Sequence, residues 1–269
     1  MAGQTAPPHT ESSSAPLWHV DAVLRLGDDA LILAQRASEW AGHGPVLEED
    51  LAMANIGLDL LGQARMLLSH AGELEGNARD EDALAYFRDS PFFRNHSLSE
   101  LPNGQGKHDD YAVTIMRHYL HSERMVLVWE WLAESADPQL VNIAAKAIKE
   151  AKGHLRHARQ WVIRFGDGTE ESHLRAQSAL NLLWPYTNEY FKDDETDQSA
   201  AAAGIIPLPS SLKDQWLQQV ATTLNEATLA QPDKSGFLST GKSGQHTEHL
   251  DYLLAEMQSV ARAHPGAQW

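Results

Sequence analysis

The sequence predicts an all-α protein whose core is a bundle of four long helices. Apolar residues recur at steps of three and four through several long stretches, and no stretch shows the strict alternation typical of β-strands. The four longest helices form two pairs with short loops, and a connection of about 35 residues separates the pairs. Two helical hairpins joined by one long crossover are the connectivity of the ferritin-like bundle. We therefore expect a ferritin-like four-helix bundle with additional flanking C-terminal helices.

The stretch at residues 47–74 predicts the helix around which the others pack. Its apolar residues follow two helical rows, so this helix needs neighbours on more than one side. The first row is Leu47, Leu51, Ala54, Leu58, Leu61 and Leu68, and the second is Met53, Gly57, Leu60, Ala64, Leu67, Ala71 and Leu74. A polar row lies between them and predicts either a solvent-facing edge or polar groups carried into the bundle; it consists of Asn55, Asp59, Gln63 and His70.

Capping residues and turn signals predict where the helices begin and end. Asp28 is the expected N-cap of the first helix, and Asp137 followed by Pro138 caps and starts the fourth. The four expected helices span residues 28–42, 47–74, 110–134 and 137–166, with one short helix at 82–88 inside the long connection. Three flanking helices are expected at residues 169–183, 210–230 and 247–263, and loops at 192–209 and 233–245.

The composition bounds the class of protein. A net charge of −16 argues against nucleic acid or an anionic membrane as a partner, because both require a positive surface. The chain has no cysteine, so it has no disulfide and no thiolate metal site. The start of the sequence lacks a basic region followed by an apolar one, and we expect a cytoplasmic protein. Residues 1–17 are expected to be a disordered extension, and 18–269 a single ferritin-like helical domain.

A ferritin-like bundle raises the question of a di-iron site. Such a site takes a Glu from each of two helices and a Glu-x-x-His from each of the other two. The only Glu-x-x-His in the sequence is Glu170 to His173, in the first turn of a flanking helix, where a cap at Thr169 or Asp167 explains the acidic residues better. Around Asp59 the second helix lacks a histidine, and around His154 the fourth lacks a carboxylate. We therefore expect no catalytic, cofactor-binding or metal-binding residue.

Several polar residues could mark the remnant of such a site. Glu39 and Glu123 are the carboxylates best placed to face inward, and a buried carboxylate needs a partner. The hypothesis is a vestigial polar plug of residues that hydrogen-bond one another, formed by Glu39, Asp59, Gln63, Glu123 and His154. The alternative is that each carboxylate simply pairs with a neighbouring Arg or His. Pairs of histidines at helical spacing, such as His154 and His157, lack an evident third ligand.

The fourth helix carries a basic row in an otherwise acidic protein. Lys149, Lys152, Arg156 and Arg159 follow one another at helical steps. The hypothesis is that this row meets a charged partner surface. The alternative is a solvated helix face, which is the usual role of charges along a helix.

Long segments of the sequence resemble a known family. They include LRLGDDALILAQRASEWAGHGPVLEEDLAMANIGLDLLGQAR, IAAKAIKEAKGHLR, GKSGQHTEHLDYLLAEMQ and the ending PGAQW. These segments resemble the C subunits of bacterial phenylacetyl-CoA epoxidases, and the similarity runs from about residue 20 to residue 269.

The resemblance implies a metal-free, non-catalytic structural subunit that pairs with a homologous catalytic A subunit, which holds the di-iron centre. It also implies a complex with a small B subunit, a further small subunit and a flavin/iron–sulfur reductase. That complex would use oxygen and NADPH to epoxidise the aromatic ring of phenylacetyl-CoA in phenylacetate degradation. With such a substrate, the phosphates of CoA are a second possible contact for the basic row. Two alternatives stay open from the sequence: a ferritin-like di-iron oxygenase that binds metal itself, and a free-standing homodimer.

Overall fold

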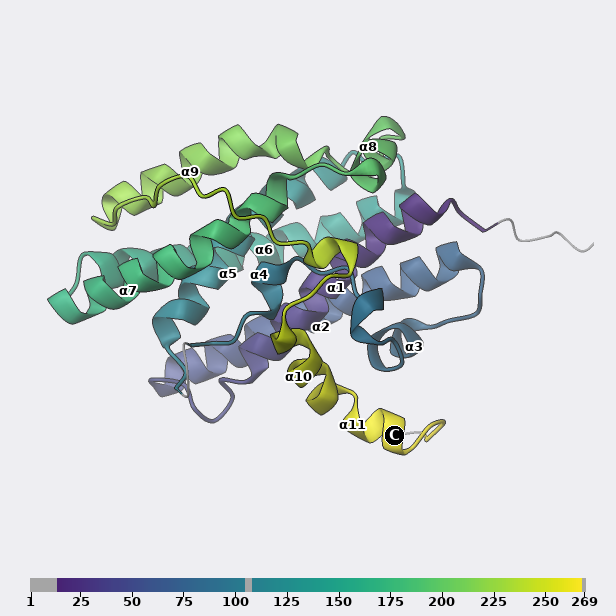
Figure 1. Cartoon of the computed structure of the whole chain (residues 1–269), viewed down its shortest axis with the longest axis horizontal. Coiled ribbons are helices and arrows are strands. Elements are labelled where there is room, and N and C mark those ends of the chain that lie inside the picture. The colour runs from purple at the N-terminus through teal and green to yellow at the C-terminus, as the bar shows by residue number, and fades with distance from the viewer. Residues whose placement is uncertain (1–13, 105–107, 268–269) are drawn as a thin grey trace, which may run out of the picture.

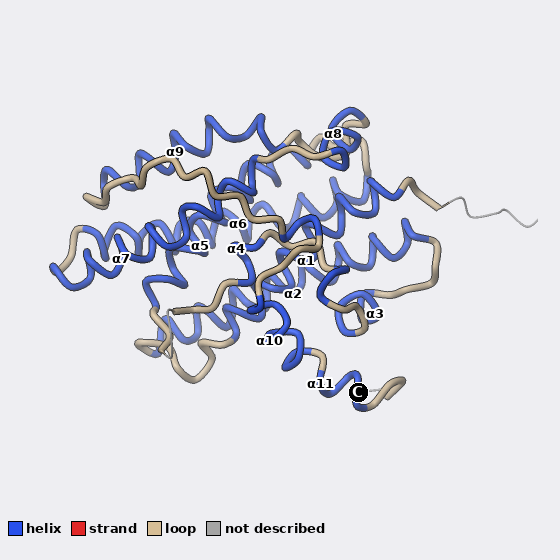
Figure 2. Tube along the Cα trace, in the orientation of Figure 1, coloured by secondary structure: helices blue, strands red, loops and turns tan. Residues whose placement is uncertain are grey.

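The computed structural model describes residues 14–104 and 108–267 of the chain, and most of these residues lie in helices. Figure 2 shows helices and loops and no strand among them; one isolated β-bridge joins Thr240 to Gln245. The α-helices are α1 (Leu17–Ser38), α2 (Leu47–Glu75), α3 (Glu81–Tyr86), α4 (Ser97–Glu100), α5 (Tyr111–Leu132), α6 (Pro138–Gly166), α7 (Glu170–Leu183), α8 (Glu195–Ala202), α9 (Lys213–Glu226), α10 (Glu248–Met257) and α11 (Ser259–Ala263). The expected all-α class is confirmed.

The four long helices form two hairpins, as the sequence predicts. α1 packs mainly against α2, and α5 packs mainly against α6. The segment that contains α3 and α4 crosses from the first hairpin to the second, and α2 then lies beside α6. Asp110 caps α5 by accepting from the backbone N–H of Ala112 at 2.9 Å, and Asp137 caps α6.

The first helix begins eleven residues earlier than expected. α1 starts at Leu17, so Asp28 is not an N-cap but lies in mid-helix with no exposed surface. The carboxylate of Asp28 is buried against the guanidinium of Arg88 in the crossover. This ion pair lets α1 continue through a charged position, because a buried charge is tolerated when it is paired and hydrogen-bonded. The predicted disordered extension at 1–17 therefore ends too late, and residues 1–13 lie outside the described part of the chain.

The prediction that residues 47–74 form the central helix is wrong. α1 and α5 are buried on nearly every side, whereas α2 exposes the row of Leu47, Leu51, Leu58 and Leu61. Charged residues along α1 can be buried because residues distant in the sequence form hydrogen bonds and ion pairs with them. Arg25, for example, donates to Asp194 and Asp197 near α8 at 2.7–3.0 Å.

The flanking helices are mostly where the sequence places them. Thr169 and Ser172 form a capping box at the start of α7, which confirms that the acidic residues there belong to a helix start. The predicted loop at 192–209 instead contains α8, which begins with a capping box of Asp194 and Asp197. In Figure 1, α9 lies along the upper edge of the molecule, and α10 and α11 project from the lower edge.

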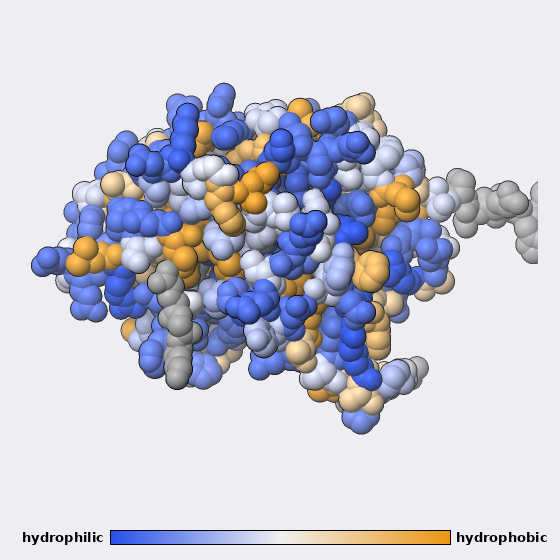
Figure 3. Space-filling model, viewed as in Figure 1, coloured by the Kyte–Doolittle hydropathy of each residue, from blue (hydrophilic) through white to orange (hydrophobic). Residues whose placement is uncertain are grey.

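The surface of the protein is expected to be mainly hydrophilic, because the sequence carries a net charge of −16. Hydrophilic residues dominate the face drawn in Figure 3, where hydrophobic residues lie in small separate patches. None of the helices between residues 14 and 267 that the structure describes combines the length and apolarity of a membrane span.

Candidate functional site

Three histidines meet in the interior between α5 and α6. His118 and His121 come from α5 and His154 from α6, and all three are buried. The rings of His118 and His154 lie 5.5 Å apart between centroids. Together with Asp29 of α1 and Gln63 of α2, they border a cavity of about 10 Å³. A cavity of that size holds about one water molecule.

Burial keeps these imidazoles neutral. Desolvation lowers the pKa of His121 to about 3 against the attraction of Asp29, and it lowers the pKa of His118 well below the ordinary value. Burial also lowers the pKa of His154, although a hydrogen bond to Asp59 opposes the shift. The interior therefore gains no positive charge from histidine at neutral pH.

Asp29 is the only carboxylate among the residues that border this cavity, and its oxygens are already engaged. Oδ2 accepts from Nδ1 of His96 at 2.6 Å, while Oδ1 accepts from the His96 backbone N–H at 2.8 Å and from the Ser99 hydroxyl at 2.7 Å. Burial alone would raise the pKa of Asp29, but His96 and these hydrogen bonds hold it well below its usual value. Sequence reasoning missed Asp29 because the first helix was expected to begin at Asp28, which placed Asp29 in its first turn rather than in the interior.

Two of the five predicted plug residues are joined. Nε2–H of His154 on α6 donates to Oδ2 of Asp59 on α2 at 3.1 Å. Close by, the side-chain amide of Gln63 donates to Glu150 of α6 at 2.9 Å. Asp59 and Gln63 therefore link α2 to α6, but each does so through a separate partner.

Glu39 and Glu123 lie elsewhere, so the five residues do not form one hydrogen-bonded cluster. Glu39 caps the end of α1, is exposed, and accepts from Arg36 at 2.6 Å and Asn103 at 2.7 Å. It misses the interior because α1 begins early, which puts Asp29 rather than Glu39 at the middle level of the helix. Glu123 is buried near Tyr119 and Arg159, on the side of α5 that meets α9. Burial raises the pKa of Glu123 to about 7, although Arg159 opposes the shift.

The basic row on α6 is partly neutralised within the chain. Nζ of Lys152 lies 2.8 Å from Oε1 of Glu130. Arg159 forms an ion pair with Glu226, and its Nε–H donates to the hydroxyl of Thr223 at 3.1 Å. Lys149 and Arg156 are exposed and have no ion-pair partner among the described residues. Whether this row meets a partner or CoA stays a prediction.

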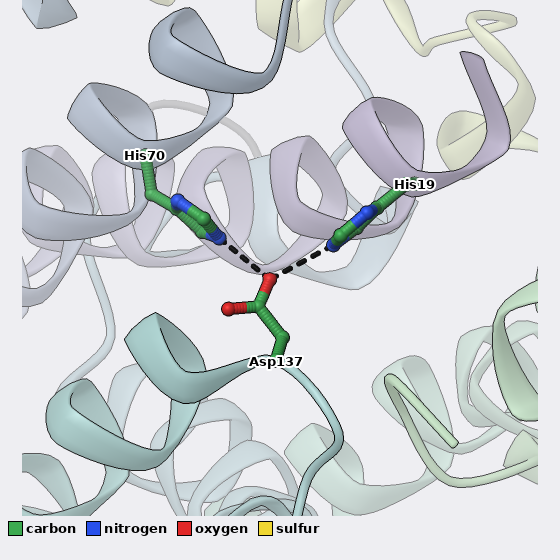
Figure 4. Close-up of side chains that lie close together, drawn as sticks. All are labelled: His19, His70 and Asp137. Atoms are coloured by element: carbon green, nitrogen blue, oxygen red, sulfur yellow. Dashed lines mark hydrogen bonds and ion pairs between the residues drawn. The ribbon is translucent and has the colours of Figure 1, made fainter. Parts of the chain in front are cut away.

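A second histidine–carboxylate group lies at the end of the bundle (Figure 4). Nε2–H groups of His19 from α1 and His70 from α2 both donate to Oδ2 of Asp137, at 2.8 Å and 2.7 Å. Burial alone would raise the pKa of Asp137, but the hydrogen bonds from His70 and His19 outweigh it and hold the pKa below its usual value. Each of the three residues offers one atom that could bind a metal ion, and these three atoms lie within 4.8 Å of one another. Sequence reasoning missed this group because His19 was placed before the first helix.

The exposed leucines on α2 form a leucine stripe, defined by Leu47, Leu51, Leu58 and Leu61. Their exposed fractions are 72%, 56%, 65% and 40%. At about 1.5 Å per residue the stripe is roughly 21 Å long. Beside its end, Leu58, Leu61 and Tyr86 border a groove of about 470 Å³ between α2 and α3. An exposed apolar row of this kind is a candidate interaction surface.

The residues of the bundle interior do not fit a di-iron centre. Such a centre takes four carboxylates and two histidines from four helices. Around the interior cavity the chain supplies three imidazoles and the single carboxylate of Asp29, which His96 and Ser99 already occupy. The fold and this site define an all-helical protein whose buried carboxylate is engaged by its own side chains, while Nε2 of His118 and Nε1 of Trp129 have no hydrogen-bond partner among the described residues.

Comparison with known proteins places the chain in a family. Residues 4–269 match the family described as phenylacetic acid catabolic protein, and the chain belongs to that family. It is also 50% identical over 246 residues to the C subunit of 1,2-phenylacetyl-CoA epoxidase from Escherichia coli strain K12, covering 91% of this chain and 97% of the relative. The resemblance drawn from the sequence is confirmed.

Proposed function

We propose that this chain is a non-catalytic structural C subunit of a phenylacetyl-CoA epoxidase in phenylacetate degradation. The observation that carries the proposal is the bundle interior, where three neutral imidazoles and one fully engaged carboxylate take the place of the di-iron ligands. The relative from Escherichia coli, which is named as the C subunit of such an enzyme, supports the same role. The cytoplasmic location expected from the sequence belongs to this proposal.

The architecture supports a ferritin-like bundle. Two antiparallel hairpins, α1–α2 and α5–α6, are joined by one long crossover, and this connectivity is the ferritin-like one. A catalytic partner of the same architecture would hold the di-iron centre. In this chain the corresponding interior would stabilise the bundle by hydrogen bonds instead.

The leucine stripe is the surface we assign to that catalytic A subunit. The stripe has the length of a helix face, and it has no neighbour on the described part of this chain that covers it. Gly62 lies beside Leu61 at the same face, and a Cβ there would meet nothing within 4 Å. A helix of the partner could therefore approach α2 closely at this point, since glycine is a residue that permits close backbone approach. The small subunits and the reductase would join the assembled pair.

The test is co-expression of this chain with the catalytic A subunit, followed by co-purification and iron analysis. We expect a stable complex whose iron belongs to the A subunit. Leu58→Glu in the stripe should abolish co-purification, because it places a charge in an apolar interface. Leu174→Glu is the matched control, since Leu174 is also an exposed leucine, at 60%, but lies on α7.

Each alternative gives a different result in this experiment. Stoichiometric iron in the bundle interior of the isolated chain would support a di-iron oxygenase and overturn the structural role. A homodimer that persists when the A subunit is present, and that Leu58→Glu breaks, would show that the stripe serves self-association. Equal loss of the complex in Leu58→Glu and Leu174→Glu would remove the assignment of the stripe.

A further inference from the structure

We propose that His19, His70 and Asp137 form a zinc-binding site at the end of the bundle. The three residues come from three separate helices: the first turn of α1, the last part of α2 and the N-cap of α6. Figure 4 shows both imidazole rings directed at a single oxygen of Asp137, His70 from the left and His19 from the right. These residues are not among those that border the cavity in the bundle interior, and the inference does not depend on the proposed function.

The donor atoms are nearly in place for a metal ion. Both Nε2 atoms lie 2.7–2.8 Å from Oδ2 of Asp137. Bonds of about 2.0–2.1 Å to a tetrahedral zinc ion place two donor atoms roughly 3.4 Å apart. To admit the ion, the two Nε2–Oδ2 separations therefore need to widen by about 0.6 Å, and the separation between the two imidazole nitrogens, which is at most 4.8 Å, needs to reach the same roughly 3.4 Å.

The donor set selects zinc over the abundant hard cations. Two imidazole nitrogens and one carboxylate oxygen suit zinc, whereas magnesium and calcium prefer oxygen ligands alone. The side chains of Asp137 and His70 are 5% and 8% exposed, so water competes little for the ion on that side. His19 is 14% exposed, and this side leaves room for approach from solvent and for a water molecule as the fourth ligand.

Metal binding is compatible with the structural role of Asp137. Its other oxygen, Oδ1, accepts from the backbone N–H groups of Gln139 and Leu140 at 2.9 Å and 3.3 Å, and so caps α6. Only Oδ2 faces the histidines. The cap can therefore stay intact while Oδ2 exchanges two hydrogen bonds for one metal bond.

The histidines are also suited to the exchange. When Nε2 binds the ion, each imidazole carries its proton on Nδ1. Nδ1 of His70 is buried and has no hydrogen-bond partner among the described residues, so it is unsatisfied with or without a proton, and the tautomer change sacrifices no contact there. Trp18 stacks on the His19 ring with centroids 5.6 Å apart and holds its orientation.

The test is a zinc titration of the full chain without an affinity tag, after removal of metal by chelation. We expect one equivalent of zinc per chain, a melting temperature that rises with zinc and falls again with EDTA, and no such rise with magnesium. Cobalt(II) in place of zinc should give the visible absorption of a nitrogen- and oxygen-bound ion. These readouts require no enzymatic activity.

Two variants remove ligands, and a third is the matched control. Asp137→Asn keeps a good capping side chain but loses the anionic ligand, and His70→Gln removes an imidazole; each should weaken zinc binding by at least about 10-fold. His43→Gln removes an exposed histidine from the loop between α1 and α2 and should change nothing. The melting temperature of Asp137→Asn without metal reports whether its fold is intact.

Three results would overturn the site. They are an absence of stoichiometric zinc on the wild-type chain, binding that survives both ligand variants, and equal weakening in His43→Gln, which would mean adventitious binding to surface histidines. Loss of the cobalt absorption in Asp137→Asn with an unchanged metal-free melting temperature would confirm it.

Discussion

The Nε2–H group of His154 donates to Oδ2 of Asp59 and joins α6 to α2 at 3.1 Å. This hydrogen bond is one of three histidine–carboxylate links along the same pair of helices. The other two are His157 with Glu49 at 2.8 Å and His70 with Asp137 at 2.7 Å. Imidazoles and carboxylates are the side chains that could bind a metal ion in another bundle. Here they hydrogen-bond one another, and these bonds hold the two hairpins together.

Glu123 makes the stability of the protein depend on pH. Burial raises the pKa of its carboxyl to about 7, whereas the unfolded chain ionises near the ordinary value. The unfolded state therefore loses its proton first, and stability falls as pH rises from about 4.5 to 7. Glu123→Gln should remove this fall, so that the variant is about 1–3 kcal/mol more stable than wild type at pH 8 and similar at pH 5.

Urea unfolding at both pH values measures this difference. A wild-type stability that rises between pH 5 and pH 8 relative to Glu123→Gln would contradict the assignment. Neither this substitution nor Glu39→Gln should lower the turnover of the reconstituted epoxidase, because neither carboxyl lies in a catalytic centre under the proposed function.

Asp29 should be far more important for stability than Asp59. Asp29→Asn leaves His96 and Ser99 without their charged acceptor inside the protein and should cost about 2–4 kcal/mol at pH 7. Asp59 is 44% exposed, and Asp59→Asn should cost less than about 1 kcal/mol. The stabilisation from Asp29 is present above the ordinary pKa of aspartate and is lost as pH falls below it, because the pKa in the folded state is lowered. Denaturant titrations of both variants measure the loss in free energy of unfolding. Equal losses for Asp29→Asn and Asp59→Asn would contradict the prediction.

The basic row of α6 gives a prediction about assembly. Reversing Lys152 and Arg156 to Glu should weaken the complex with the A subunit several-fold at low salt and much less at high salt, since screening removes the charge term. Lys213→Glu on α9 is the control for a charge reversal elsewhere on the surface. Affinity measured against ionic strength separates the two, and an unchanged affinity at low salt would leave the row as a solvated face.

Gly62 and Gly153 lie in the middle of α2 and α6, where a Cβ would meet nothing within 4 Å. Glycine inside a helix costs about 0.5–1 kcal/mol relative to alanine. Gly62→Ala and Gly153→Ala should therefore each stabilise the isolated chain by about that amount, measured by thermal or urea unfolding. If the catalytic partner packs closely on α2, Gly62→Ala should at the same time weaken the complex, and a complex unaffected by the substitution would argue against close approach at that point.

Much of the fold could be predicted from the sequence because its signals are local. The periodic apolar rows, the cap at Asp137 and the cap expected at Thr169 or Asp167 all act within a few residues, and the structure confirms the helices with caps at Asp137 and Thr169. The start of α1 was misplaced because the partners that make Asp28 and Asp29 tolerable in mid-helix lie at least 60 residues away. A local pattern of two acidic residues before an apolar row looks the same whether they cap a helix or are buried in it.

The candidate site was harder to predict for the same reason. The absence of any Glu-x-x-His from the four long helices was visible in the sequence, but the identity of the inward groups was not. His118, His121 and Asp29 border the same cavity only once the two hairpins have packed together. The group of His19, His70 and Asp137 likewise joins residues up to 118 positions apart.

Two buried carboxylates of the structure depend on the end of the chain. Glu100 has no exposed surface and accepts from Nδ1 of His246 at 2.7 Å and the backbone of Thr247 at 2.6 Å, and Glu189 accepts from Ser239 and Lys242 at 2.7 Å and 2.8 Å. During synthesis these acceptors leave the ribosome long before their donors do. A buried carboxylate without its donors is strongly unfavourable. Asn95 and Ser97 also donate to Glu100 and Glu189, but full satisfaction of both carboxylates requires residues 239–247. We therefore expect the crossover to pack stably over the bundle only after residues 239–247 have been made.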